Sequence, residues 1–104
     1  MIEDKKYEIN IIVRTIYLPE QSDETLDHYV FAYTITITNN GAIAATLISR
    51  RWIITDANCK VQEVSGEGVI GEQPYIVPGD SYRYTSAAMI ETPVGCMEGS
   101  YQMV

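Results

Sequence analysis

The stretch 28-HYVFAYTITITN-39 decides the fold, because its apolar and polar residues alternate more regularly than anywhere else in the chain. One face consists of aromatic and β-branched residues, namely Tyr29, Phe31, Tyr33, Ile35 and Ile37, and the other face of alanine and threonine. A period of two is the side-chain spacing of a β-strand. One apolar and one more polar face are typical of an antiparallel sheet that covers a core.

The segments on either side of this stretch are also predicted to be strands. Upstream, 7-YEINIIVRTIY-17 alternates and ends before Pro19, which cannot donate to a continuing ladder. Downstream, 39-NNG-41 predicts a tight turn. The next strand, expected over residues 44–55, has apolar residues on both faces: Leu47 and Ile53 on one, and Ile48, Trp52 and Ile54 on the other. This pattern favours a central strand of a sandwich, with Trp52 in the core.

The rest of the chain consists of short strands and turns. We expect a strand over Val61–Val64, a glycine-rich connection over 66–71, a turn at 78–80 and a strand around Tyr82 and Tyr84. A break at 92–95 precedes a last strand that begins at Tyr101. Turn signals about every ten residues, with no helical period, indicate an all-β antiparallel β-sandwich over residues 1–104.

Composition disfavours several classes of function. Seven basic and fourteen acidic residues give a net charge of −7, which disfavours binding to nucleic acid. No apolar run approaches the roughly 18 residues of a spanning helix, so membrane insertion is not expected. The charged opening MIEDKKYEIN does not resemble a signal peptide, and we expect a cytoplasmic protein. In that compartment Cys59 and Cys96 are expected to be reduced and separate.

The polar segment 18–27 is a candidate divalent-cation site, because it carries Glu20, Asp23, Glu24 and Asp27. Carboxylate oxygens suit hard cations, but the spacing matches no calcium-loop pattern. A solvated acidic loop is the favoured interpretation, because most charge runs simply face water.

The glycine run Gly66-Glu-Gly68-Val-Ile-Gly71 matches the dinucleotide-binding fingerprint as a string. That fingerprint works by placing a pyrophosphate at the N-terminus of a following helix, and here Glu72-Gln73-Pro74 follows instead. A structural role in turns or bulges is favoured. A nest of backbone amides could still form a weak phosphate loop at these glycines, although Glu67 and Glu72 would oppose an anion.

No catalytic constellation is recognisable, so we do not expect an enzyme and we assign no cofactor. His28 is the only histidine and is interpreted as a surface residue at a strand start. Asp56 follows a strand and is expected to cap backbone amides in a turn.

Several motifs lie in the order found in the ApaG family, also called CorD. They are YTITI at 33–37, WIITD at 52–56, VSGEGVIGEQP at 64–74, TPVG at 92–95 and YQM at 101–103. The sequence resembles this family over nearly its whole length. The resemblance implies an immunoglobulin- or fibronectin type III-like sandwich and a non-enzymatic binding module. It further implies an unidentified protein partner and an association with cobalt resistance and magnesium efflux.

The sequence departs from the family pattern in three ways. Arg51 stands where histidine is common, which weakens a metal role there, and Cys59 and Ala87 stand where glycine is common. Family members run about twenty residues further, the length of a loop and a strand. The protein is therefore either a short variant or longer than this sequence, and the domain over residues 1–104 is expected to lack a C-terminal strand. An unpaired sheet edge would then favour a homodimer. A direct sensor of a cation, pyrophosphate or nucleotide is the alternative to the binding module.

Overall fold

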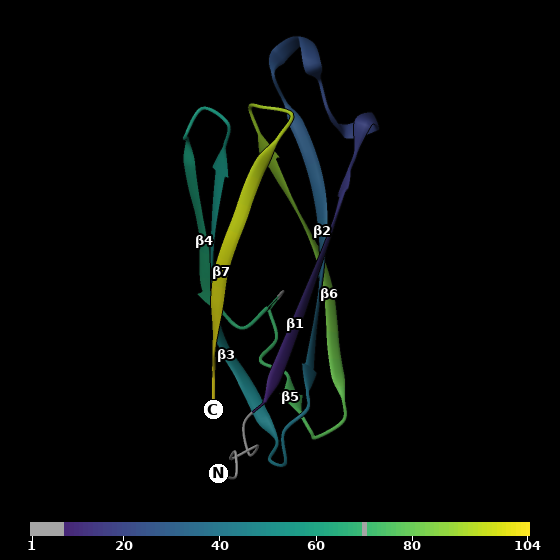
Figure 1. Ribbon diagram of the computed structural model, residues 1–104, viewed down its shortest axis with the longest axis vertical. Helices are drawn as coiled ribbons and strands as arrows, with labels where there is room; N and C mark the ends of the chain where they lie inside the picture. The colour runs from purple at the N-terminus through teal and green to yellow at the C-terminus, as the bar shows by residue number, and fades with distance from the viewer. Residues whose placement is uncertain (1–7, 70) are drawn as a thin grey trace, which may run out of the picture.

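The computed structural model describes residues 8–69 and 71–104, which form two antiparallel β-sheets (Figure 1). Tyr7, expected in the first strand, lies outside the described residues. The strands are β1 (Ile9–Tyr17), β2 (Tyr29–Asn39), β3 (Ala45–Asp56), β4 (Val61–Glu67), β5 (Tyr75–Ile76), β6 (Ser81–Ile90) and β7 (Gly95–Met103). Two short 3₁₀ helices, η1 (Pro19–Gln21) and η2 (Glu24–Leu26), lie between β1 and β2. The all-β prediction is confirmed.

The first sheet has the order β1-β2-β6, with β2 in the centre. On β2, Tyr33, Ile35 and Ile37 are buried, as their alternation predicts. Ile35 lies opposite Val13 on β1 and opposite Tyr84 on β6, so these side chains point to the same face. The regular period of β2 therefore sets which face of the sheet covers the core.

The second sheet is built on β3, the central strand expected from its apolar residues on both faces. One edge of β3 pairs with β7. The other edge pairs with β5 at Ala45 and Thr46, and with β4 from Ser49 to Thr55. Leu47, Trp52 and Ile54 are all buried. The prediction that Leu47 points away from Trp52 and Ile54 is wrong, because the register with β7 shifts between Leu47 and Ser49. Such a bulge adds one residue and reverses the alternation beyond it.

The two sheets enclose one core, to which both contribute buried residues: Tyr33, Ile35, Ile37, Leu47, Trp52, Val69, Ile76 and Tyr84. The ring of Trp52 packs edge-on against Tyr101, with 5.8 Å between ring centroids. Trp52 is thus a core residue, as predicted.

Two strand predictions need correction. The last strand begins at Gly95 and not at Tyr101, and β5 was not expected. Gly95 belongs to the expected break at 92–95, and Gly99 lies before the expected start of the strand. A Cβ at Gly99 would overlap the carbonyl oxygen of Arg51 and the ring of Trp52. Glycine is needed at position 99 because β7 packs closely on β3 and Trp52.

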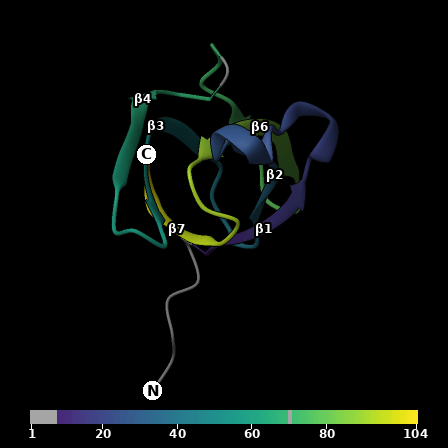
Figure 2. The ribbon, with the colours of Figure 1, turned by 90° about the horizontal axis from the view of Figure 1, so that it is seen from above.

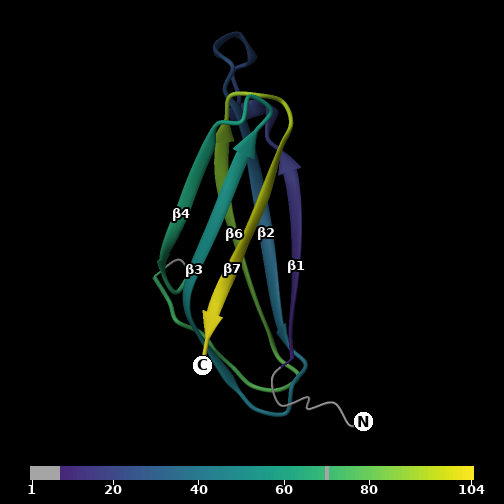
Figure 3. The same ribbon diagram turned by 60° about the vertical axis from the view of Figure 1, so that its left-hand side comes forward.

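The two long sides of the sandwich differ (Figure 2). On one side, the connection from β4 to β6 inserts Val69 and Ile76 into the core, with exposed fractions of 0% and 3%. We call this the closed side. On the opposite side β7 and β1 flank the space between the sheets, and we call this the open side (Figure 3).

Candidate functional site

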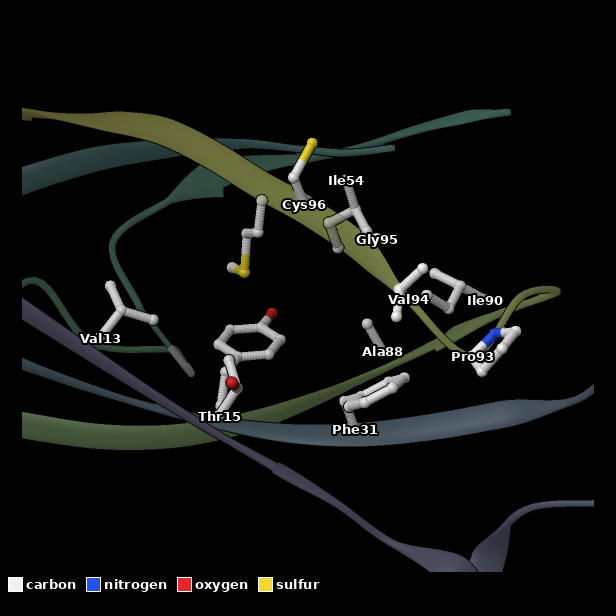
Figure 4. Close-up of a pocket in the computed structure, with 12 residues that line it drawn as sticks. Val13, Thr15, Phe31, Ile54, Ala88, Ile90, Pro93, Val94, Gly95 and Cys96 are labelled. Carbon is white, nitrogen blue, oxygen red and sulfur yellow. The ribbon is translucent and has the colours of Figure 1, made fainter. Parts of the chain in front are cut away.

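An apolar groove of about 420 Å³ runs between β1 and β7 on the open side (Figure 4). Its walls come from both sheets and from the loop between β6 and β7. The lining residues are Val13, Thr15, Phe31, Tyr33, Ile54, Ala88, Ile90, Pro93, Val94, Gly95, Cys96 and Met97. None of them is Asp, Glu, Lys, Arg or His, so the lining suits apolar groups.

The groove exists because the inner face of β1 is incompletely covered. Ile11, Val13 and Tyr17 share the inward side of the sheet with their cross-strand neighbours on β2. Ile35, the neighbour of Val13, is fully buried, whereas Val13 itself is 39% exposed. The second sheet ends at β7, which pairs only with β3 among the described strands. The groove is therefore the part of the inner face of the first sheet that the described strands of the second sheet do not cover.

Cys59 and Cys96 are both exposed, and no disulfide joins them in the structure. Figure 4 shows the sulfur of Cys96 directed away from the groove. Cys59 has φ 65°, a left-handed conformation that favours glycine. The backbone at this position explains why glycine is common there in the family that the sequence resembles.

The acidic loop has a structural role in the residues described. The Asp23 carboxylate accepts hydrogen bonds from the backbone N–H of Thr25 (3.1 Å) and from its hydroxyl (2.6 Å), and so caps η2. The Thr25 hydroxyl is the main cause that lowers the pKa of Asp23. Within residues 8–69 and 71–104, no group of three or more His, Cys, Asp or Glu side chains is placed to hold a metal ion. A cation site at Glu20, Asp23, Glu24 and Asp27 stays a prediction without geometric support.

The glycine run builds the closed side of the sandwich. Gly66 is in β4, and Gly68 and Gly71 have φ of 62° and 76°. Gly68 donates to the carbonyl of Ile48 (2.7 Å), and Val69 and Glu72 exchange backbone hydrogen bonds (2.7 and 3.0 Å). These amides are therefore already occupied. A phosphate loop at Gly66, Gly68 and Gly71 stays a prediction, and the observed role of the turn is to direct Val69 into the core.

Asp56 caps a turn, as the sequence predicts. Its buried carboxylate accepts hydrogen bonds from the backbone N–H groups of Asn58 (2.8 Å) and Lys60 (2.9 Å). The adjacent Ala57 N–H donates to the hydroxyl of Thr92, which donates to the carbonyl of Val94. This chain of bonds ties the β3–β4 turn to the loop at the end of the groove.

His28 and Arg51 also have structural partners. The backbone of His28 exchanges hydrogen bonds with that of Asp23 and closes the loop between β1 and β2. Arg51 is exposed, and its Nε donates to the carboxylate of Glu63 on β4 (3.1 Å). Neither residue is among those that line the groove.

Comparison with known proteins places the chain in a family. A family model described as the ApaG domain matches residues 19–104. The chain belongs to the ApaG family. It is 64% identical over its full length to the ApaG protein of Nitrosospira multiformis and also to that of Thiobacillus denitrificans, and it covers 82% of each relative.

Solved structures agree with this assignment to the ApaG family. A crystal structure of a Bordetella pertussis protein, provisionally described as ApaA, has a TM-score of 0.95 and 49% identity. The match covers 98% of this chain and 83% of that one. The names of these relatives state no reaction, ligand or partner. No helix among the described residues is long and apolar enough to cross a membrane.

Sequence reasoning missed the groove, although one signal was present. The alternation in β1 correctly predicts which residues face inward, but it cannot show whether a second sheet lies over them. The width of the two sheets decides that point. The expected homodimer through a sheet edge stays a prediction.

Proposed function

We propose that this ApaG-family domain is a non-enzymatic protein-binding module whose contact surface is the groove between β1 and β7. The observation that carries the proposal is the apolar lining of the groove, together with the 39% exposure of Val13 on its wall. Exposed apolar patches next to polar surface mark interaction sites in proteins. The absence of charged or histidine side chains from the groove lining makes chemistry at this surface unfavourable.

Matched variants on one strand test the proposal. Val13 and Ile12 are neighbours on β1 with exposed fractions of 39% and 46%, but only Val13 lines the groove. Val13→Lys should abolish capture of a partner from cells, whereas Ile12→Lys should leave capture unchanged. Equal capture by both variants would place the binding surface elsewhere.

The physiological part of the proposal is a partner involved in cobalt and magnesium homeostasis in the cytoplasm. The family resemblance supports it, and the free thiols of Cys59 and Cys96 agree with a reducing compartment. Cells that lack the protein should lose cobalt tolerance and regain it with wild type or Ile12→Lys. If Val13→Lys also restored cobalt tolerance, the groove would not be needed for that tolerance.

A direct ligand sensor is the alternative, and a thermal-shift titration with cobalt, magnesium, pyrophosphate and ATP separates the two. Binding to the folded state alone would raise the melting temperature. We expect flat curves at millimolar ligand. A saturable rise that is lost in the double variant Asp23→Asn, Glu24→Gln would instead support the cation site.

A further inference from the structure

We propose that the outer face of the first sheet binds an acidic segment of another protein through Arg14 and Arg83. This face lies on the opposite side of the sheet from the groove, so the inference does not rest on the proposed function. The partner is defined by its chemistry: two carboxylates four residues apart in an extended stretch of chain.

The first sheet differs from the second in its charge. β1, β2 and β6 contain neither Asp nor Glu, and Arg14 and Arg83 are their only charged residues. In the second sheet, by contrast, β3, β4 and β7 all carry acids, namely Asp56, Glu63, Glu67 and Glu98. The first sheet is therefore a local region of positive charge in a chain whose net charge is −7.

Both arginines point away from the core. The strand register places Arg14 opposite Thr34 and Arg83 opposite Thr36. These threonines alternate along β2 with the buried Ile35, so they and the arginines beside them share the outer face of the sheet. Arg14 and Arg83 are both exposed. The strands that form this face all belong to the first sheet, whereas the last residues of the sequence follow β7 in the second sheet.

The two guanidinium groups are available to a partner. Within the part of the chain that the structure describes, neither group has an ion-pair or hydrogen-bond partner, whereas Arg51 pairs with Glu63 and Lys60 pairs with Glu91. The planar fork of donors on an arginine matches the two oxygens of a carboxylate. Each arginine can therefore bind one carboxylate of a partner.

The spacing of the arginines fits an extended chain. They lie on β1 and β6, on either side of β2, and their positions in the register differ by two residues along β2. With strands about 4.8 Å apart and a rise of about 3.4 Å per residue, their Cα atoms are separated by about 12 Å. In an extended segment, side chains four residues apart point to the same side and are separated by about 13 Å. Carboxylates at this interval can reach both arginines at once.

Hydroxyl groups between the arginines supply further donors. The hydroxyls of Thr34 and Thr85 are hydrogen-bonded to each other at 2.9 Å. This bond uses one of the two hydroxyl protons, so the other can donate to a carboxylate or a backbone carbonyl of the bound segment. The face thus presents positive charge and hydroxyl donors together.

An acidic protein segment fits this face better than a nucleic acid does. The aromatic residues of β2 and β6 all lie in the inward register and offer no ring for base stacking on the outer face; they are Tyr29, Phe31, Tyr33, Tyr82 and Tyr84. A nucleic acid would also bring many phosphates towards a chain with a net charge of −7. A short segment with two carboxylates interacts mainly with charges within a Debye length, about 8 Å at physiological ionic strength, where the two arginines dominate.

The test is an NMR titration of the protein with a synthetic peptide that carries two aspartates four residues apart, separated by serine and glycine. We expect saturable shifts of the backbone amides around Arg14, Thr34 and Arg83, and none around Glu63 and Glu98 on the second sheet. The same peptide with asparagine in place of both aspartates should not bind. A peptide with the aspartates two residues apart should bind more weakly, because it cannot reach both arginines.

Matched arginine variants show whether the peptide occupies this face. Arg14→Gln and Arg83→Gln should each weaken binding about threefold, and the double variant about tenfold, as expected for exposed ion pairs. Arg51→Gln is the control, since Arg51 is also exposed but pairs with Glu63 on the second sheet. The double variant Arg14→Lys, Arg83→Lys keeps the charge without the planar fork, and its affinity should lie between those of wild type and the double glutamine variant.

The other outcomes overturn the proposal. Absence of saturable binding by the two-aspartate peptide, or binding that ignores both Arg14→Gln and Arg83→Gln, would reject it. Tighter binding of a single-stranded oligonucleotide through the same arginines would make nucleic acid the occupant, and saturation of the same amides by inorganic phosphate alone would make the face a small-anion site. Any of these results would leave the groove proposal standing, because neither arginine lines the groove.

Discussion

On both the closed and the open side of the sandwich there is a space between the two sheets, and the sides differ in how far side chains fill it. On the closed side, a connection with two glycines at positive φ turns Val69 into the core, and β5 adds Ile76. On the open side the apolar residues of β1 remain between 37% and 40% exposed at Ile11, Val13 and Tyr17. The difference predicts that the closed side and the centre contribute more to stability than the open side does.

The largest effect is expected at the centre of the sandwich, at Trp52. Trp52→Ala removes a ring that is 95% buried and contacts Tyr101, and large-to-small changes of this kind cost about 3–5 kcal/mol. Urea unfolding monitored by circular dichroism measures the loss. Val13→Ala is the control on the open side and should cost less than about 1 kcal/mol. Similar losses for the two variants would mean that the open side carries as much of the core as the centre.

A smaller loss is expected where β7 packs on the centre of the sheet, at Gly99. Gly99→Ala forces a methyl group against the carbonyl oxygen of Arg51 and the ring of Trp52, and overpacking typically costs about 1–3 kcal/mol. Ser100→Ala, at the next position and exposed, should stay within about 0.5 kcal/mol. Thermal unfolding of the pair measures the difference. An unchanged melting temperature of Gly99→Ala would show that β7 can move away from β3.

The sequence predicts the regular parts of this fold well and the irregular parts poorly. The period of β2 correctly identifies Tyr33, Ile35 and Ile37 as core, because no bulge interrupts it. In β3 the same reasoning fails at Leu47, since the register shift before Ser49 has no local sequence signal. The sequence places Gly95 in a break because it does not show that Gly95 lies against the carbonyl oxygen of Thr55 on β3.

The candidate site was less predictable than the fold. The acidic loop and the glycine run stand out in the sequence because of their composition, and both serve local structure here: Asp23 caps η2, and Gly68 positions Val69. The groove depends on which strands face each other across the sandwich. It is assembled from residues as far apart as Val13 and Met97, and no local pattern connects them.

The contact between the sheets at Tyr101 gives a pH-dependent prediction. Burial, and then the hydrogen bond to the Tyr84 hydroxyl (2.6 Å), raise the pKa of Tyr101 above its ordinary value near 10. The unfolded chain then loses this proton at a lower pH than the folded chain does. The stabilisation is complete below about pH 10 and decreases as the pH rises above it.

Tyr101→Phe tests this contribution. The variant should lose about 1 kcal/mol of stability at neutral pH, because the Tyr84 hydroxyl loses its hydrogen-bond partner. Between about pH 9 and 11, the range around the tyrosine pKa of the unfolded chain, its stability should fall less steeply than that of wild type. Tyr75→Phe, at an exposed position, is the control. Parallel pH profiles for wild type and Tyr101→Phe would mean that another group causes the alkaline loss.

The most direct comparison of the two sides makes the same substitution, valine to the isosteric threonine, on each of them. Val69→Thr puts a hydroxyl at a fully buried position on the closed side, and without a partner this costs about 1–3 kcal/mol. Val13→Thr puts the same hydroxyl at the groove wall, where 39% exposure lets water solvate it, and the change should stay within about 0.5 kcal/mol. Denaturant midpoints measure both. A large loss at Val13 would show that the groove is dry and contributes to folding, so that a binding partner would gain little by covering it. A near-zero change at Val13 would show that this wall contributes little to folding.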